Sequence, residues 1–239
     1  MSPPTGTLWC VPTPIASDRA PADDLPGPVL QRVAGLDYLI AESPRTARAF
    51  LKQLTLSRPI QSIEITTLDE HTPDEAIDSL LAPLLAGRDA GLVSEAGCPG
   101  VADPGARLVL AAHAAGIPVM PLAGPSAILL ALMGSGLDGQ RFGFVGYLPT
   151  DPEQRRRRLR ELEQRSRRDG ETIVLIETPY RNQAMLEALL GTLQPSTWLC
   201  VAADLTGLAQ RLATERVRDW RTHVPTLARV PTVFVLRAA

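Results

Sequence analysis

Residues 92 to 105 read LVSEAGCPGVADPG, a stretch that leaves a short apolar run and then holds three glycines, two prolines and two carboxylates. Glycine permits positive φ and close backbone approach, so a loop of this composition presents main-chain N–H and C=O groups to a bound molecule. Ligands of open α/β sheets bind beyond the carboxyl ends of the strands. We therefore interpret this stretch as a binding loop between a strand and a helix.

Other stretches share this richness in glycine, proline or acidic residues, and each follows or lies beside a predicted strand. They are LWCVPTPIA at residues 8–16, YLIAESPRTA at 38–47, PLAGPSA at 121–127 and LIETPYR at 175–181. Loops at successive strand ends fall on one edge of a sheet, so residues far apart in the sequence can converge there. The spacing predicts one binding cleft built from several loops.

Short apolar runs alternate with helical patterns along almost the whole chain. The predicted strands are 8–11, 38–41, 90–93, 142–147, 172–176, 199–203 and 230–236. The predicted helices are 44–54, 73–86, 104–115, 126–133, 153–168 and 181–190. This alternation predicts an α/β fold with mostly parallel strands in the first half and helical crossovers between them.

The segment PLAGPSAILLALMGSG, residues 121–136, is the best candidate for a domain boundary. Its prolines and glycine interrupt the periodicity where a second set of strands and helices begins. We expect a join near Leu122, which gives an N-terminal α/β domain over 1–121 and a C-terminal α/β domain over 122–239. The alternative is an ordinary strand-to-helix loop within one sheet.

Composition narrows the class of protein. The chain has 239 residues, is 45% hydrophobic and carries a net charge of −2, which neither demands nor excludes a nucleic-acid partner. It has no signal-peptide pattern and no run of about 18 uncharged apolar residues, so we expect a cytoplasmic protein without a membrane partner. Its three cysteines and three histidines lack ligand spacing, and we expect no metal site.

Residues 154–168, QRRRRLRELEQRSRR, concentrate arginines on a predicted helix. In one interpretation this helix is simply solvated, and Glu161 and Glu163 partly offset the arginines. In the other, the helix contacts phosphate groups. The sequence leaves both open.

Six motifs in order resemble the tetrapyrrole methylase superfamily, and within it the branch that methylates ribose 2′-hydroxyls of small-subunit rRNA. They are TPI at 13–15, AE-x-x-R at 41–45, VSEAG-x-P-x-x-ADPG at 93–105, PL-x-GPSA at 121–127, SGL-x-x-x-RF-x-F-x-GYLP at 135–149 and ETP-x-R at 177–181. The resemblance implies two α/β domains, S-adenosylmethionine in the cleft between them, and a homodimer. It also implies rRNA or the small ribosomal subunit as partner.

Carried over position by position, the resemblance implies a set of cofactor contacts. They are Pro12, Ser94, Glu95, Ala96, Gly97, Val101, Ala102, Asp103, Ser126, Ala127, Tyr180, Pro231 and Thr232. Backbone amides and carbonyls with small polar side chains suit the adenine, ribose, carboxylate and sulfonium of adenosylmethionine. For Ser94, Ser126 and Thr232 taken singly, ordinary turn or cap chemistry is an alternative.

Methyl transfer to oxygen is an in-line displacement, which a group that helps to deprotonate the hydroxyl would assist. Candidate catalytic residues at or near the motif positions are Glu42, Arg45, Glu70, His71 and Glu177, and Arg181 is a further candidate to hold phosphate or orient a carboxylate. We favour Glu42 with Arg45. The alternative for that pair is a structural ion pair at the start of the helix that begins at Pro44.

The chain departs from the rRNA-methylating branch on the substrate side. It has TPIASD where the branch has TPI-G-N-L, AESPR for AEDTR, SEAGCP for SDAGTP, and ADLTG where the branch has arginine-glutamate-leucine-threonine-lysine. Three interpretations follow. The chain is an rRNA ribose methyltransferase, a methyltransferase acting on a tetrapyrrole or another small molecule, or a cofactor-binding regulatory protein without turnover.

Overall fold

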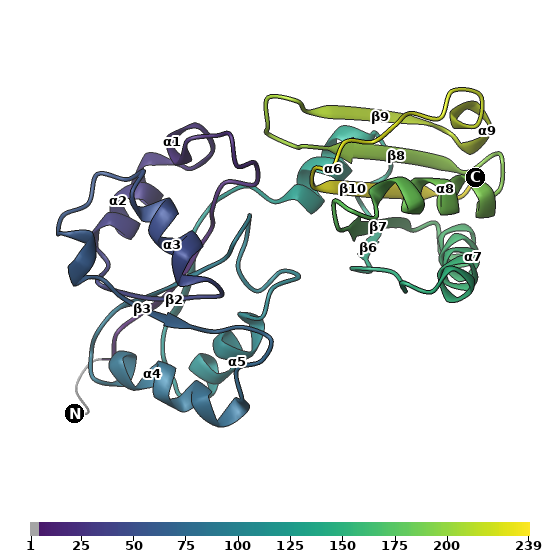
Figure 1. Ribbon diagram of the computed structural model, residues 1–239. Helices are drawn as coiled ribbons and strands as arrows, with labels where there is room; N and C mark the ends of the chain where they lie inside the picture. Colours follow the sequence, from purple (N-terminus) through teal and green to yellow (C-terminus); the bar gives the residue numbers. More distant parts are fainter. Residues whose placement is uncertain (1–4) are drawn as a thin grey trace. The chain divides into compact units, whose positions relative to one another are not determined.

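The computed structural model describes residues 5–239, and the chain divides into two compact units between Ser126 and Ala127 (Figure 1). The join predicted from the sequence was near Leu122. Within the described residues, no helix is long and apolar enough to cross a membrane. Each unit has its own five-stranded sheet and is described separately.

The first unit is a parallel sheet with the strand order β3-β2-β4-β1-β5. Its strands are β1 (Leu8–Val11), β2 (Tyr38–Ala41), β3 (Glu64–Thr67), β4 (Ala90–Val93) and β5 (Val119–Pro121). Its helices are α1 (Pro21–Asp24), α2 (Gly27–Gly35), α3 (Pro44–Leu51), α4 (Ile77–Leu85) and α5 (Ala106–Ala114), with 3-10 turns η1 (Ile60–Ser62) and η2 (Asp74–Ala76).

Helices cover both faces of this sheet, as the buried strands require. β2 and β4 are buried throughout, and successive residues alternate between two apolar clusters. Leu39 packs with Val33 of α2 and Phe50 of α3, whereas Ile40 packs with Leu84 of α4 and Leu108 of α5. Figure 1 shows α2 and α3 on one side of β2 and β3, and α4 and α5 on the other.

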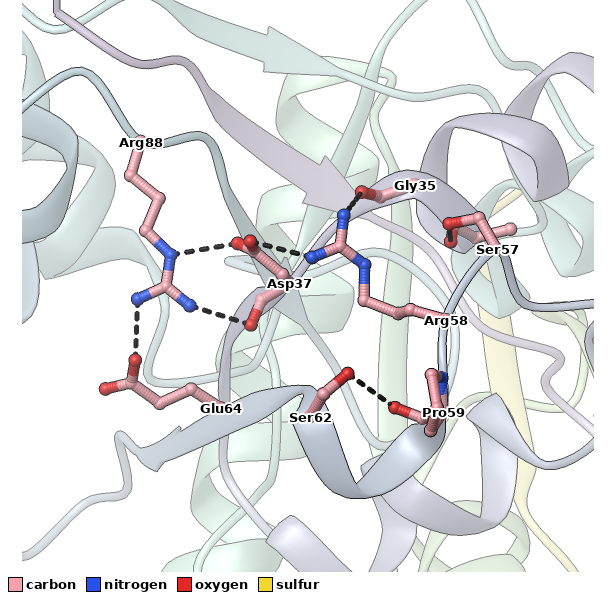
Figure 2. A network of polar contacts seen from close by, with 9 residues as sticks. Gly35, Asp37, Ser57, Arg58, Pro59, Ser62, Glu64 and Arg88 are labelled. Carbon is pink, nitrogen blue, oxygen red and sulfur yellow. Dashed lines mark hydrogen bonds and ion pairs between the residues drawn. The ribbon is translucent and has the colours of Figure 1, made fainter.

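An ion network joins the amino ends of β2, β3 and β4 (Figure 2). Arg88 donates to both Asp37 Oδ1 (2.8 Å) and Glu64 Oε2 (2.6 Å), and Arg58 donates to Asp37 Oδ2 (2.8 Å) and the Gly35 carbonyl (3.2 Å). The hydrogen bond from Arg88 is the main cause that lowers the pKa of Asp37 below its ordinary value, although burial opposes it. The network holds three neighbouring strands at the edge opposite to the predicted binding loops.

The second unit is a mixed sheet with the order β6-β7-β10-β8-β9, in which only β6 and β7 are parallel. Its strands are β6 (Phe142–Phe144), β7 (Thr172–Glu177), β8 (Trp198–Ala203), β9 (Arg211–Arg216) and β10 (Thr232–Arg237). Its helices are α6 (Ala127–Ser135), α7 (Pro152–Asp169), α8 (Asn182–Thr192) and α9 (Val217–Trp220). α7, α8 and α9 cover one face, and α6 covers the other.

The α/β prediction, with parallel strands in the first half, is confirmed, but several element boundaries are wrong. β6 ends at Phe144, three residues early, because Gly146 turns the chain with φ 66°. α5 begins at Ala106, because Asp103 and Pro104 belong to a preceding turn. The elements not predicted from the sequence are short or partly exposed: α1, α2, α9, η1, β3, β5 and β9.

Replacing Arg88 by methionine tests the network at the amino ends. We expect the variant to lose about 1 kcal/mol of unfolding free energy at neutral pH, because about a third of both the Arg88 and Asp37 side chains is exposed and solvent screens the pair. The loss should shrink below pH 3.8, the ordinary value of Asp37, because its lowered pKa stabilises the fold only while it is ionised. Denaturant titration above and below this pH measures the loss of unfolding free energy.

The control is Arg48→Met, which removes an exposed arginine of α3 with no acidic partner in the described part of the chain. An equal loss in both variants would contradict a special role for Arg88.

Candidate functional site

The register of the first sheet places its binding loops at one level. Val11, Ala41 and Val93, the last residues of β1, β2 and β4, are paired across the sheet. The loops that begin at Pro12, Glu42 and Ser94 therefore leave the same edge side by side. The convergence that the sequence predicted is present for these loops of the first unit.

The first and third loops are joined by hydrogen bonds. Thr13 and Gly97 form a two-residue antiparallel bridge, with N–H···O distances of 2.9 and 3.1 Å. The buried Ser94 hydroxyl donates to the Gly97 carbonyl at 2.7 Å, and the Thr13 hydroxyl lies 3.4 Å from both the Ser94 carbonyl and its hydroxyl. Ser94 thus shapes the loop, as the turn-chemistry interpretation expected.

The second loop contacts the third through the first turn of α3. Ser43 is the N-cap, and its hydroxyl accepts from the Thr46 N–H at 3.3 Å. The Thr46 hydroxyl donates to Glu95 Oε1 at 3.2 Å. The exposed carboxylate of Glu95 is therefore held beside α3.

A fourth loop, which follows β5 and contains Gly124 and Pro125, approaches the other three through its glycine. A Cβ at Gly124 would lie 2.3 Å from Pro12, so only glycine fits there. Next to it, the Pro125 carbonyl accepts a weak hydrogen bond from the Cys98 thiol at 3.4 Å. The glycine-proline motif brings the end of the first unit against both the first and the third loop.

The second half of the third loop is a strained turn. Ala102 has φ 57°, a region that residues with a side chain rarely adopt. Asp103 Oδ1 accepts from the N–H groups of Gly100 (3.2 Å) and Gly105 (2.9 Å). Asp103 therefore holds the turn, while Val101 and Ala102 are exposed at its tip. Strain of this kind, with exposed residues at its centre, is typical of ligand-binding loops.

The carboxyl edge of the first sheet is acidic. Burial raises the pKa of Glu42 above its ordinary value, and the negative charges of Glu95, Asp103, Glu70 and Asp69 raise it further, in that order. A carboxylate with a raised pKa is a better base than an ordinary one. The combined field of these groups favours a positively charged ligand.

The structural alternative for Glu42 and Arg45, an ion pair at the start of α3, is absent from the described residues. Among the described residues no salt bridge joins them, and the start of α3 is capped by Ser43 instead. Arg45 is exposed and has no acidic partner there. The structural alternative for this pair therefore falls, and a catalytic role for each residue stays a prediction.

Glu70 and His71 lie on the loop after β3, also at the carboxyl edge. Their side chains are 82% and 84% exposed and lie 3.6 Å from each other. Arg107 of α5 holds this loop by donating to the Asp69 carbonyl at 2.6 Å. The two residues are thus placed near the acidic cluster but pack against little in the first unit.

A cavity of about 430 Å³ opens beside the joined loops. It is lined by Thr13, Pro14, Ile15, Ala16, Ser17, Arg19, Thr46, Ala49, Phe50, Gln53, Ser94, Glu95 and Ala96. Two larger cavities, of about 570 and 560 Å³, lie elsewhere around α2 and touch none of the predicted site residues. We favour the smaller cavity, because it alone adjoins the carboxyl edge, where sheets of this kind bind ligands.

In the second unit, Glu177 and Arg181 join two loops. Glu177 ends β7, and its buried side chain pairs with Arg181 at 2.7 Å. Arg181 also donates to the carbonyl of Leu148, at 3.2 Å, and Leu148 lies on the loop that follows β6. Between them in sequence, Tyr180 is 82% exposed. The buried Glu177 carboxylate is therefore held by Arg181, which makes it a less accessible candidate than Glu42.

Asn182 was not among the site residues predicted from the sequence. It is 1% exposed, and its Nδ2 donates to the Val230 carbonyl (2.6 Å) and to the Thr232 hydroxyl (2.9 Å). Its Oδ1 is buried without a hydrogen-bond partner in the described residues. A buried acceptor left unpaired is unfavourable, so a ligand or water that donates to it would stabilise this corner beside Pro231. Its only sequence signal is its place directly after the ETPYR motif.

The comparisons with known proteins decide the family. The family model described as tetrapyrrole (corrin/porphyrin) methylases matches residues 28–220. The chain belongs to this family. The prediction that it is an S-adenosylmethionine-dependent methyltransferase is confirmed with it.

Three similar proteins carry the name ribosomal RNA small subunit methyltransferase I. That of Xylella fastidiosa is 34% identical and is aligned over 94% of this chain and 77% of its own length. Those of Synechocystis and Escherichia coli O157:H7 are 35% and 32% identical over 84% of this chain, and over 67% and 66% of their own lengths. The chain thus spans about two thirds to three quarters of these relatives.

Two solved structures share the fold. The methyltransferase CobJ has a TM-score of 0.64 at 20% identity, covering 98% of this chain and 95% of its own. The uroporphyrin-III-C-methyltransferase of Thermus thermophilus has a TM-score of 0.55 at 20% identity, covering 97% and 92%. At this identity the likeness establishes the fold of this methylase, and the fold prediction is confirmed.

Glu42→Gln should stabilise the protein. The raised pKa means that the ionised carboxylate is disfavoured in the folded state, a cost that is absent below pH 4.5 and grows as the pH rises through the raised value. We expect an increase in unfolding free energy of less than about 1 kcal/mol at neutral pH that vanishes below pH 4.5. Denaturant unfolding at the two pH values measures it. A loss of stability at neutral pH, or the same gain from the exposed control Glu75→Gln, would refute the acidic-edge interpretation.

Proposed function

We propose that this methylase transfers the methyl group of S-adenosylmethionine to a ribose 2′-hydroxyl of small-subunit rRNA. The similarity to three proteins named for that ribosomal subunit, at 32 to 35% identity over 84 to 94% of the chain, carries the substrate class. The choice of the ribose hydroxyl follows the motif resemblance. The proposal includes a cytoplasmic location, a homodimer, and the small ribosomal subunit or its rRNA as partner.

The side chains at these loops fit adenosylmethionine. The acidic carboxyl edge suits a sulfonium cation, and the unpaired Asn182 acceptor suits an amino or hydroxyl donor. We assign cofactor contacts in the first unit to Pro12, Ser94, Glu95, Ala96, Gly97, Val101, Ala102, Asp103 and Ser126. In the second unit we assign them to Ala127, Tyr180, Pro231 and Thr232. Bound adenosylmethionine supplies a methyl group on a positively charged sulfur.

Glu42 is the proposed general base. Burial and the neighbouring carboxylates hold its pKa above the ordinary value, which improves its ability to accept the proton of the attacking hydroxyl. Arg45, Glu70 and His71 stay candidates for orienting the acceptor, and Glu177 with Arg181 orders the loop that carries Tyr180. The acceleration arises mainly from the alignment of the two reacting atoms and the exclusion of water.

A tetrapyrrole or another small molecule is the second candidate acceptor. The substitutions at the substrate-side motifs favour it, because they change the residues expected to contact the acceptor. A cofactor-binding protein without turnover is the third interpretation. Product analysis separates the three.

Ala96→Trp should abolish cofactor binding. Ala96 is exposed and lines the cavity, so an indole there fills space without disturbing the core. We expect calorimetric titration to show binding of adenosylmethionine and adenosylhomocysteine by the unaltered protein, and at least about tenfold weaker binding by the variant, a change of about 1.4 kcal/mol. Ala114→Trp, on the exposed end of α5, is the control. Absence of binding by the unaltered protein would contradict the cofactor assignment.

Glu42→Gln should lower kcat for methylation of small ribosomal subunits from a deletion strain by about 10²-fold or more, with little change in KM. Mass spectrometry of the rRNA locates the methyl group. Methylation of a base in place of ribose, or of an added tetrapyrrole in place of rRNA, would overturn the proposed acceptor.

A further inference from the structure

The two units carry opposite net charge. Residues 1–126 contain 8 basic and 14 acidic side chains, and residues 127–239 contain 16 and 12, which gives −6 and +4. The acidic edge of the first unit repels a polyanion, so the attraction that a nucleic-acid substrate requires has to come from the second.

Half of the 16 basic side chains of the second unit lie on α7, and most of these are already engaged. Glu153, Glu161, Glu171 and Asp169 pair with Arg156, Arg158, Arg165 and Arg168, in that order. Arg155 is buried and donates to the Thr150 carbonyl at 3.5 Å, and Arg167 donates to the Ala239 carbonyl at 3.4 Å. These six side chains have partners in the fold itself.

Arg157 and Arg160 differ from the other six. Both are exposed, and neither has an acidic partner among the described residues. Three positions apart on a helix, their side chains lie next to each other. They point away from the buried side of α7, where Leu159 and Leu162 pack on the sheet. Two adjacent unpaired guanidinium groups keep their full donor sets for phosphate oxygens.

An exposed aromatic side chain lies on the loop that leads into α7. Tyr147 is 57% exposed, follows the left-handed Gly146, and precedes Leu148, whose carbonyl accepts from Arg181. That bond and the one from Arg155 to the Thr150 carbonyl hold the second half of the loop. Exposed aromatic rings and unpaired arginines together are the elements that bind single-stranded RNA, since the rings stack on bases and the arginines hold the backbone.

We propose that Tyr147, Arg157 and Arg160, here called the α7 surface, bind a single-stranded segment of the RNA substrate. This inference rests on the proposed function. α7 and its preceding loop lie together in the second unit (Figure 1), so the surface is built by one continuous stretch of chain.

The test compares Arg157→Gln/Arg160→Gln with a control of equal charge loss, Arg48→Gln/Arg211→Gln, whose arginines are also exposed and without acidic partners in the described residues. Anisotropy of a labelled single-stranded oligouridylate is measured between about 50 and 200 mM salt. We expect the α7 variant to bind at least about fivefold more weakly, with a salt slope smaller by about 1.4, the value for two single-strand phosphate contacts. The control should keep the slope.

Tyr147→Ser should weaken the same binding about fivefold or more without changing the slope, because stacking involves no counterion release. With small ribosomal subunits as substrate, the arginine variant should raise KM and leave kcat and adenosylmethionine binding unchanged.

Unchanged RNA affinity in the α7 variant would overturn this proposal and leave the proposed function standing, provided that the unaltered protein methylates rRNA. Equal binding of anionic lipid vesicles or of an acidic peptide would also overturn it, since the surface would then be a general polyanion site. Absence of both RNA binding and rRNA methylation by the unaltered protein would refute the proposed function as well.

Discussion

The parallel pairing of β4 with β1 and β2 is the constraint on which the site depends. In this register the three strands end together, at the paired residues Val11, Ala41 and Val93. The loops after them therefore leave the sheet side by side. Loops in register can then be joined by short backbone hydrogen bonds, as Thr13 and Gly97 are. A slip of one residue would invert the strand faces and remove this alignment. The ion network around Asp37 holds two of these strands, β2 and β4, together with β3, at their other end.

The site in the first unit is built at some expense to stability. Glu42 is partly buried among other carboxylates, and Ala102 has a left-handed backbone that its side chain disfavours. Both features oppose folding, and both lie on the edge where the loops converge. Sites that bind and activate ligands commonly hold such unfavourable arrangements, while the surrounding core supplies the stability. Here the two apolar clusters on the faces of the parallel sheet supply it.

The sequence predicted β1, β2 and β4 with their correct ends, because each is a short apolar run followed at once by proline, glutamate or serine. It missed β3 and β9, whose residues are half exposed and give no clear period. It found the glycine-rich loops but not Asn182, since a single polar residue at the start of a helix looks like an ordinary surface residue. Ser43 caps α3 in place of an ion pair between Glu42 and Arg45. The sequence does not distinguish these two, because the choice depends on backbone geometry.

The opposite charges of the two units are hidden in the near-neutral total of −2. Charge of both signs, separated along the chain, gives a molecule an electric dipole even when its sum is small. In the field of a polyanion a dipole experiences a torque before any contact forms, within a screening distance of about 8 Å at physiological salt. For the RNA substrate proposed above, the basic unit would be attracted and the acidic unit repelled, so this charge separation would favour encounters through the basic unit.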